Sequence, residues 1–445
     1  MSGRRKRGRR SRRSANKNGL NYFPAFVMGM IFVLVIVGLF FGVKAISGAS
    51  SKLAKEAIEN TTDFVAATDN KLFGDVTNEK YAKSNKAYII NYPKFNNKNG
   101  DAKIDEIIQT IKNDFNESAT VKKNTYVLFV DYSTKYINNK TAGLITFTAK
   151  SGIYSQELKD KKYEITVNPE TGDQLKLKDV LYGDYLNKID LLMKRDLGYG
   201  ADEITEDFTN FTLTSSSLKL KLEKDEYEIP ARLLSDISDI SDIDPNKPMI
   251  ALTFDDGPNT ETTTKLIDCF NKYNGKGTFF VLGDRINNYS DTLLECYLNG
   301  NEIGSHTLNH KVLSKLSQSE LEYQINKTDE LIKNVIGTKP KVVRPPYGDR
   351  NENVIKTINR PVIIWNVDTL DWKTRSAQST TNSILSNASD GDIILMHDIY
   401  DSSVQGAIDA IPTLIERGYQ LVTVSELIKY KGEKATAKVY YDLNK

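Results

Sequence analysis

Residues 252–258, with the sequence LTFDDGP, decide the fold of the C-terminal part of the chain. This stretch carries the apolar run that begins at Met249 into two adjacent carboxylates, Asp255 and Asp256, and then into a Gly-Pro turn. The order predicts a buried strand that presents two acids at its carboxyl end. Catalytic groups gather at that end of the strands in parallel α/β barrels, because the loops there form the pocket. Adjacent carboxylates repel each other unless a cation or a shared proton compensates, so the pair indicates a metal site.

All three histidines of the chain stand in short polar clusters that follow apolar runs. His306 and His310 are four positions apart, and His397 closes the run that begins at Ile393. A His-x3-His spacing places two imidazoles on one face of a helical turn, within reach of one ion. One Asp and two His leave room for water, as a hydrolytic zinc site requires. The alternative for each histidine is an ordinary, partly buried side chain.

Strands and helices are predicted to alternate after residue 248. The amphipathic segments 262–273 and 320–335 separate short apolar runs, which predicts an α/β fold with a parallel barrel. The apolar runs are 249–254, 277–282, 302–305, 342–344, 361–367, 392–396 and 420–424.

Five ordered motifs in this part of the chain resemble those of polysaccharide deacetylases, the carbohydrate esterase family 4 or NodB-homology domain. They are TFDDGP at 253–258, HTLNH at 306–310, RPPYG at 344–348, DTLDW at 368–372 and LMH at 395–397. The resemblance covers about residues 248–428 and implies a distorted (β/α)7 barrel.

The resemblance also implies how one half of the site works. Asp256, His306 and His310 would hold one divalent ion, which we expect to be Zn²⁺, with Co²⁺ or Mn²⁺ as alternatives. Asp255 would take the proton from the attacking water as general base. Arg344 would clamp Asp255 and keep it ionised.

The other half of the site would protonate the leaving group and bind the substrate. The backbone N–H of Tyr347 would stabilise the oxyanion. His397 would protonate the departing amine, and Asp371 would hold its imidazole in the right tautomer. Trp372 and Leu395 would form the walls of an apolar slot for the acetyl methyl group, although each is also a common core residue type.

Two rival functions share parts of this pattern. Two His and one carboxylate also form the facial triad of non-haem Fe(II) oxygenases, but an α/β barrel argues against that class. A non-catalytic glycan-binding protein would have lost a ligand or a base, and this sequence keeps all of them. We expect the substrate to be N-acetylglucosamine in peptidoglycan, with N-acetylmuramic acid second; chitooligosaccharides and surface polysaccharides stay open.

The N-terminal sequence predicts a membrane anchor. Residues 1–22 form a basic tail, and residues 23–43 contain no charge and are long enough for one transmembrane helix. The arginines would keep the N-terminus in the cytoplasm and place the catalytic domain outside, facing the cell wall. A cleaved signal peptide is the alternative. Lys+Arg 60 against Asp+Glu 58 gives a net charge of +2, so nucleic acid is not an expected partner, and the oligomeric state stays open.

The regions between the anchor and the catalytic domain have less distinctive sequences. We predict a stalk at 44–80, an α+β module at 81–234, an acidic linker without a core pattern at 235–247, a catalytic domain at 248–430 that folds by itself, and a tail at 431–445. Within the module, 185–197 is predicted as a helix and 218–229 as one strand. Cys269 and Cys296 could form one disulfide, but we expect buried free thiols.

Overall fold

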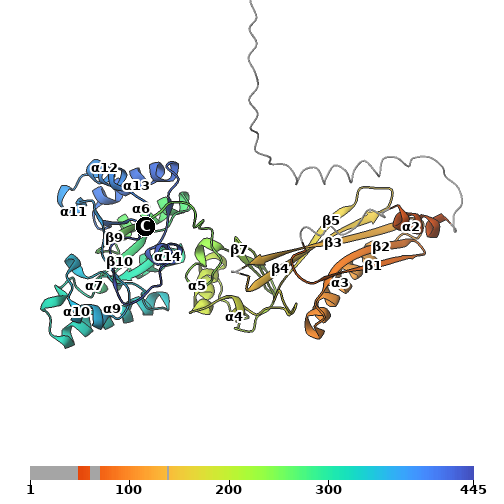
Figure 1. Ribbon diagram of the computed structural model, residues 1–445, viewed down its shortest axis with the longest axis horizontal. Coiled ribbons are helices and arrows are strands. Elements are labelled where there is room, and N and C mark those ends of the chain that lie inside the picture. The colour runs from red at the N-terminus through yellow and green to blue at the C-terminus, as the bar shows by residue number, and fades with distance from the viewer. Residues whose placement is uncertain (1–48, 61–70, 138–139, 445) are drawn as a thin grey trace, which may run out of the picture.

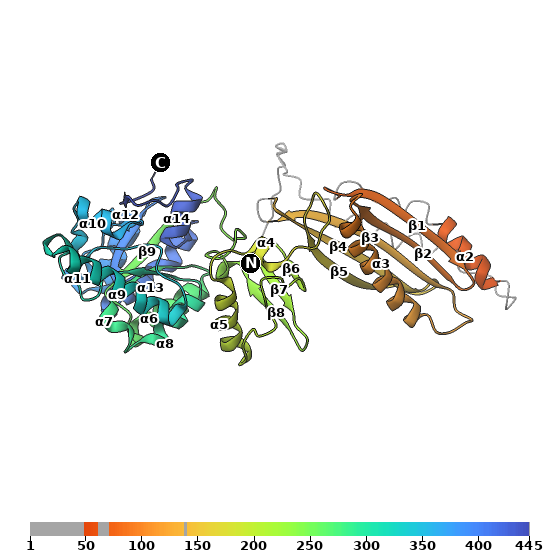
Figure 2. The same cartoon turned by 90° about the horizontal axis from the view of Figure 1, so that it is seen from below.

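The computed structural model describes residues 49–60, 71–137 and 140–444. The predicted cytoplasmic tail and transmembrane helix, residues 1–22 and 23–43, lie outside these ranges. None of the helices in the described ranges has the length and hydrophobicity that a bilayer span requires. Figures 1 and 2 show three regions in succession: a five-stranded sheet, a smaller sheet with its helices, and the α/β region near the C-terminus.

A five-stranded sheet with one long helix forms the first part of the α+β module. Its order is β1-β2-β3-β4-β5, and α3 (Lys98–Ser118) packs on it through Ile104, Ile108, Ile111 and Phe115. The strands are β1 (Asp75–Lys83), β2 (Lys86–Lys94), β3 (Tyr126–Ile137), β4 (Ala142–Ile153) and β5 (Lys159–Val167).

The predicted stalk, residues 44–80, is wrong in part. Its end belongs to β1, which pairs antiparallel with β2. β1 is an edge strand whose side chains are exposed or half-buried, so it lacks the apolar alternation that would have revealed it. Helix α2 (Ala49–Glu59) buries Ala54 and Ala57 against the same sheet.

The middle region contains α4 (Leu177–Val180), α5 (Tyr185–Leu197) and a three-stranded antiparallel sheet. Helix α5 has the predicted bounds. The prediction of one strand at 218–229 is wrong, because Leu222 N–H donates to Asp225 O and closes a turn there. The sheet consists of β6 (Phe211–Leu213), β7 (Ser217–Lys221) and β8 (Glu226–Pro230).

Residues 231–243 form a connecting segment. It packs against residues 248–444, which contain the predicted catalytic domain and are called the catalytic region. The side chains of Leu234, Ile237 and Ile240 are at most 3% exposed. Ile237 and Ile240 belong to the predicted linker 235–247, so the prediction that this linker lacks a core pattern is wrong. The Ser-Asp-Ile repeat has neither helical nor strand periodicity, yet its turns direct the isoleucines inward. One continuous apolar cluster joins Leu192 of α5, Leu234 and Phe270 of the catalytic region.

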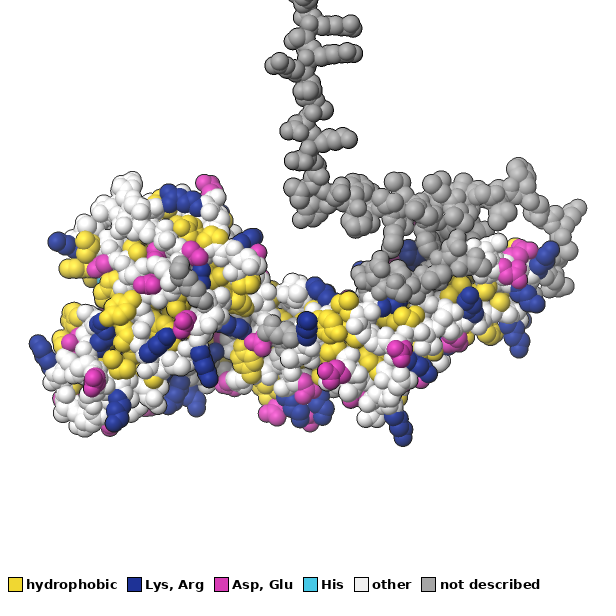
Figure 3. Space-filling model, in the orientation of Figure 1, with side chains coloured by type: hydrophobic (Ala, Val, Ile, Leu, Met, Phe, Trp, Pro, Cys, Tyr) yellow, Lys and Arg dark blue, Asp and Glu magenta, His cyan; other side chains and the backbone are white. Residues whose placement is uncertain are grey.

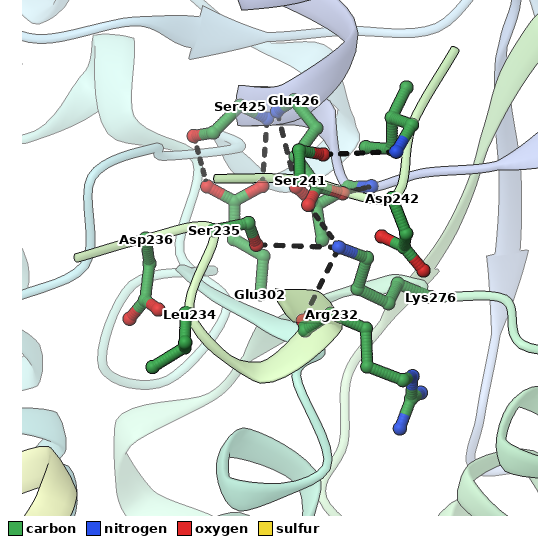
Figure 4. Close-up of polar contacts among 12 residues, drawn as sticks. Arg232, Leu234, Ser235, Asp236, Ser241, Asp242, Lys276, Glu302, Ser425 and Glu426 are labelled. Carbon is green, nitrogen blue, oxygen red and sulfur yellow. Dashed lines mark hydrogen bonds and ion pairs between the residues drawn. The ribbon is translucent and has the colours of Figure 1, made fainter. Parts of the chain in front are cut away.

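A buried polar cluster fastens the connecting segment to the catalytic region (Figure 4). Lys276 pairs with Glu426, and its Nζ also lies 3.3 Å from Ser235 Oγ and 3.5 Å from Arg232 O. Both side chains of the ion pair are at most 5% exposed. A buried ion pair stays stable only when both partners are present. The region from residue 248 is therefore not separated from the preceding residues by a solvated linker.

The catalytic region is a mixed α/β fold around parallel strands. Its main sheet has the order β11-β10-β9-β14-β13, and β15 also pairs with β9. All seven residues of β9 are buried, as in a strand covered on both faces. The strands are β9 (Met249–Asp255), β10 (Thr278–Val281), β11 (Glu302–Ser305), β12 (Val362–Ile363), β13 (Val367–Asp368), β14 (Ile393–His397), β15 (Gln420–Leu421) and β16 (Val439–Tyr440).

Helices surround these strands. The predicted helices 262–273 and 320–335 correspond to α6 and α9. The helices are α6 (Thr260–Lys272), α7 (Gly283–Ile286), α8 (Ser290–Leu298), α9 (Gln318–Ile336), α10 (Glu352–Ile358), α11 (Asp371–Thr374), α12 (Ala377–Asn387), α13 (Asp401–Glu416) and α14 (Val424–Tyr430).

Four smaller predictions concern the rest of this region. The predicted strand 342–344 is reduced to single bridges at Val343, and 361–367 is divided between β12 and β13. The tail 431–445 contributes β16, which pairs with β12. Cys269 and Cys296 are buried free thiols, as expected.

Figure 3 shows Lys and Arg interspersed with Asp and Glu on the visible face.

Candidate active site

Two neighbouring strands bring side chains that are predicted to be catalytic to the same edge of the sheet. β9 and β14 are parallel, and their register places His397 opposite Asp255. Parallel strands end at one edge, so the residues that follow them meet there. The loops after β11 and after Val343 reach the same place.

Asp255 is held by a buried arginine. Arg344 Nη1 donates to Asp255 Oδ1 at 2.8 Å and to Thr253 Oγ1 at 2.8 Å. The guanidinium also lies 4.2 Å from the ring centroid of Phe280, and the side chain is fully buried. A buried charge without its partner is strongly destabilising, so each member of this pair fixes the other.

Asp256 points away from this pair. Its φ of 72° lies in the left-handed region, so the backbone turns sharply between the two acids. Its Oδ1 is 3.6 Å from His306 Nε2 and 3.4 Å from His310 Nε2. Asp255 Oδ2 also lies 3.7 Å from His306 Nε2, so both carboxylates reach His306, but Asp255 is the one bonded to Arg344 and Asp256 is the one next to His310.

Asp256, His306 and His310 fit a divalent metal. Their candidate ligand atoms all lie within 4.8 Å of one another, and the buried Asp256 Oδ1 has no hydrogen-bond partner among the described residues. His306 Nδ1 lies 2.7 Å from Arg344 O, so an Nδ1–H that donates there leaves the Nε2 lone pair free. Burial and the nearby His306 lower the pKa of His310, which favours its neutral, ligating form.

The histidine pair converges as predicted, but not on a helical turn. Residues 306–310 form an irregular turn after β11, with left-handed φ values at Thr307 (68°) and His310 (60°). Hydrogen bonds fix this turn from outside: Gly283 N–H donates to Thr307 O at 3.0 Å, and Gln324 of α9 accepts from Leu308 N at 3.1 Å. The two imidazole centroids are 5.0 Å apart.

His397 and Asp371 form the predicted acid pair. His397 Nδ1 lies 3.0 Å from Asp371 Oδ1, and the His397 backbone N–H donates to Asp371 Oδ2 at 2.8 Å. Burial acts to lower the pKa of His397, but the hydrogen bond and the charge of Asp371 raise it to about 9. Burial likewise acts to raise the pKa of Asp371, and the bond to His397 outweighs it. The imidazole is therefore protonated near neutral pH and can donate a proton.

The three predicted substrate-contacting residues are placed less closely. Tyr347, with φ 60° and 68% exposure, packs its ring 4.6 Å from that of His310. Trp372 is 47% exposed on α11, and Leu395 is buried in β14. Among the polar and ring contacts of the described residues, none joins the side chain of Trp372 or Leu395 to the two aspartates, the three histidines or Arg344. Their roles stay predictions.

Asp398 is a site residue that sequence reasoning passed over. It is 1% exposed, and its Oδ2 accepts from Thr263 Oγ1 of α6. A Cβ on Gly257 would lie 2.4 Å from this carboxylate, so the turn after Asp256 tolerates only glycine. Burial raises the pKa of Asp398 to about 7. Its position directly after His397 was the only signal in the sequence.

Comparison with known proteins agrees with this geometry. Residues 242–361 match the polysaccharide deacetylase family. The chain is 30% identical over 474 residues to the peptidoglycan-N-acetylmuramic acid deacetylase PdaC of Bacillus subtilis, covering 91% of this chain and 97% of the relative. It is 33% identical over 330 residues to the peptidoglycan-N-acetylglucosamine deacetylase PgdA of Listeria monocytogenes, covering 66% and 70%.

Among solved structures, PdaC from Bacillus subtilis matches with a TM-score of 0.42 and 44% identity, covering 42% of this chain and 94% of that chain. The similarity to the PdaC sequence extends over almost the full length of both chains. The chain belongs to the polysaccharide deacetylase family, and it is a hydrolase that acts on N-acetyl amide bonds.

Proposed function

We propose that this chain hydrolyses the N-acetyl groups of peptidoglycan, with N-acetylglucosamine residues as the substrate, and that it does so with one divalent metal ion. The observation that carries the proposal is the convergence of Asp256, His306 and His310 between a held carboxylate and a protonated imidazole. The donor set of two nitrogens and one oxygen suits Zn²⁺, with Co²⁺ or Mn²⁺ as alternatives.

The residues of the chain divide the remaining work. A divalent ion at this site would polarise the acetamide carbonyl and acidify water. Asp255, fixed by Arg344, accepts the proton of the attacking water. His397 donates a proton to the nitrogen as the C–N bond breaks, so acetate and a free amine leave. The backbone N–H of Tyr347 is the proposed donor to the oxyanion.

We also propose that the parallel strands close into the distorted (β/α)7 barrel that the resemblance implies. Support comes from parallel bridges that link Ser305 to Val343 and Val343 to Val362. Asn366 N–H donates to Ile393 O at 3.3 Å, which leads from this edge back towards β14. A closed ring would bring all five motifs to one rim.

The proposed location is the outer face of a cell membrane. The uncharged residues 23–43, preceded by a run of arginines, support one membrane helix with the catalytic region outside. Protease added to intact cells tests this, since it should cleave the catalytic region and spare a tag on the N-terminus. A catalytic region protected until the cells are lysed would contradict it.

N-acetylmuramic acid is a second candidate substrate. The relative that matches along almost the whole chain is named for that sugar, whereas PgdA, which matches two thirds of it, is named for N-acetylglucosamine. Mass spectrometry of muropeptides from cells with and without the gene tests both. The proposal expects a loss of 42 Da per deacetylated sugar (about the mass of ketene, C₂H₂O) only when the gene is present, and identical muropeptides would refute it.

A further inference from the structure

A guanidinium stacks on the tyrosine ring that lies next to the His397 imidazole. Arg375 Cζ is 3.3 Å from the ring centroid of Tyr400, and that ring is 6.0 Å from the ring of His397. Arg375 Nε donates to Trp372 O at 2.8 Å. The planar guanidinium is therefore held on two sides, which lowers the entropy that it loses when it binds a ligand.

The short helix α11 is what brings this arginine to the site. Asp371 at its start is bonded to both the backbone and the imidazole of His397, so α11 is tied to the end of β14. Both residues that flank α11, Leu370 (φ 55°) and Arg375 (φ 49°), are left-handed without being glycine. Such backbone is costly, and it collects at ligand-binding sites.

The charge of Arg375 is available to a ligand. Among the ion pairs of the described residues, none includes Arg375. The carboxylate that follows Tyr400 in sequence, Asp401, is engaged with Lys265 at 2.9 Å. Beside Arg375, the indole of Trp372 is 47% exposed. The rim next to His397 therefore presents a fixed cation and an aromatic surface together.

We propose that Arg375 is a specificity-determining residue that selects acetylated glycans with a carboxylate close to the reacting acetamido group. The inference rests on the proposed function, because the group that reacts is the acetamide. Peptidoglycan has this chemistry, since each N-acetylglucosamine residue is bonded to an N-acetylmuramic acid residue that carries a lactyl ether. A planar guanidinium pairs with a carboxylate through two parallel hydrogen bonds. In peptidoglycan the carboxylate can be that of the lactyl group or that of the stem peptide.

Steady-state acetate release from three substrates tests the proposal on the full ectodomain. The substrates are a neutral N-acetylglucosamine oligomer, glycan strands freed of stem peptides, and intact peptidoglycan. Arg375→Gln should lower the ratio of kcat/KM on the carboxylate-bearing glycan to kcat/KM on the neutral oligomer by about tenfold, the usual effect of losing one charge-assisted contact. Arg375→Lys keeps the charge without the fork and should give an intermediate ratio. A decrease confined to intact peptidoglycan would identify the stem peptide as the source of the carboxylate.

Lys373→Gln is the matched control, because it removes a positive charge from the same short helix without touching Tyr400. Its ratio should equal that of the unchanged protein. If Arg375→Gln leaves the ratio unchanged, or if the unchanged protein prefers the neutral oligomer, Arg375 does not select for a carboxylate. If the unchanged protein releases acetate from none of the three substrates, the proposed function itself fails. A purely structural stack of Arg375 on Tyr400 would lower both rates equally and leave the ratio alone.

Discussion

The catalytic region holds two sets of buried charges that differ in how completely they are paired. At the carboxyl ends of the strands, Asp256 Oδ1 is buried and has no hydrogen-bond partner among the described residues, with His306 Nε2 and His310 Nε2 3.6 and 3.4 Å away. At the connecting segment, Lys276 pairs with Glu426 and reaches two further oxygens. An unpaired buried carboxylate is costly unless a ligand compensates, whereas a paired cluster is structural. The comparison therefore distinguishes a ligand-binding site at Asp256 from a structural ion pair at Lys276 and Glu426.

The largest effect on activity should come from substituting the two aspartates at the carboxyl ends of the strands. Asp256→Ala should remove the metal and the activity together, because two imidazoles remain where three ligands stood. Asp255→Asn should keep the metal and lose about 10²- to 10⁴-fold in kcat, the usual contribution of a general base. Metal analysis and acetate release on both variants check this. Equal metal content with equal residual activity would show that the two carboxylates do not divide the work.

Removing the connecting segment should destabilise the catalytic region. A fragment from residue 246 loses the burial of Leu234, Ile237 and Ile240. Burying one such side chain contributes about 1.5–3 kcal/mol, and the three together are comparable to the whole stability of many domains, about 5–15 kcal/mol. Thermal unfolding of this fragment, compared with residues 71–445, should show a much lower Tm or no cooperative transition. An equal Tm would instead support the prediction that the catalytic domain folds by itself.

A single substitution in the buried Lys276–Glu426 pair should lower the free energy of unfolding by less than removal of the connecting segment does. Lys276→Met leaves Glu426 buried without its cation and should cost about 3–5 kcal/mol of unfolding free energy. Urea unfolding measures this change. The control is Lys265→Met, because Lys265 is exposed and its pair with Asp401 should contribute about 0–1 kcal/mol. Similar losses in the two variants would mean that the buried cluster does not fasten the connecting segment.

The smallest effect is a displacement of the pH profile. The general acid must be protonated, so kcat should be maintained below the His397 pKa of about 9 and fall above it. Asp371 raises that pKa, so Asp371→Asn should move the alkaline limb to lower pH by about 1–3 units. Rates measured from about pH 5.5 to about 10 check the shift, because this range includes the His397 pKa of about 9 and a displacement of about 1–3 units below it. An alkaline limb that stays in place would remove His397 from the role of acid.

The sequence predicted the site better than its surroundings for a physical reason. Each catalytic group lies in a short motif at a strand end, so a local pattern reveals it. Lys276 and Glu426 are 150 positions apart and belong to no motif, so their pairing becomes visible only in three dimensions. Even at the site, local geometry was not foreseen: the turn at His306 and His310 is irregular because Gly283 and Gln324 fix it from other elements.

Strands without an alternating apolar pattern were also not predicted from the sequence. The sequence predicts a stalk where β1 lies, because this exposed edge strand carries polar residues. It predicts a tail where β16 lies, because that strand has only two residues. The sequence does not predict a role for Asp398, because a carboxylate after a histidine is uninformative until the structure places Thr263 and Gly257 against it. By contrast, the helix predicted at 185–197 has the bounds of α5.

The central claim is that Asp256, His306 and His310 hold the metal on which the hydrolysis depends. The most direct test strips the ectodomain of metal with a chelator and returns Zn²⁺ in measured steps, while acetate release from peptidoglycan is followed. We predict no activity in the stripped protein and a rise that saturates at one ion per chain, with no recovery in Asp256→Ala. Full activity in the metal-free protein, or recovery by Zn²⁺ in Asp256→Ala, would contradict the claim.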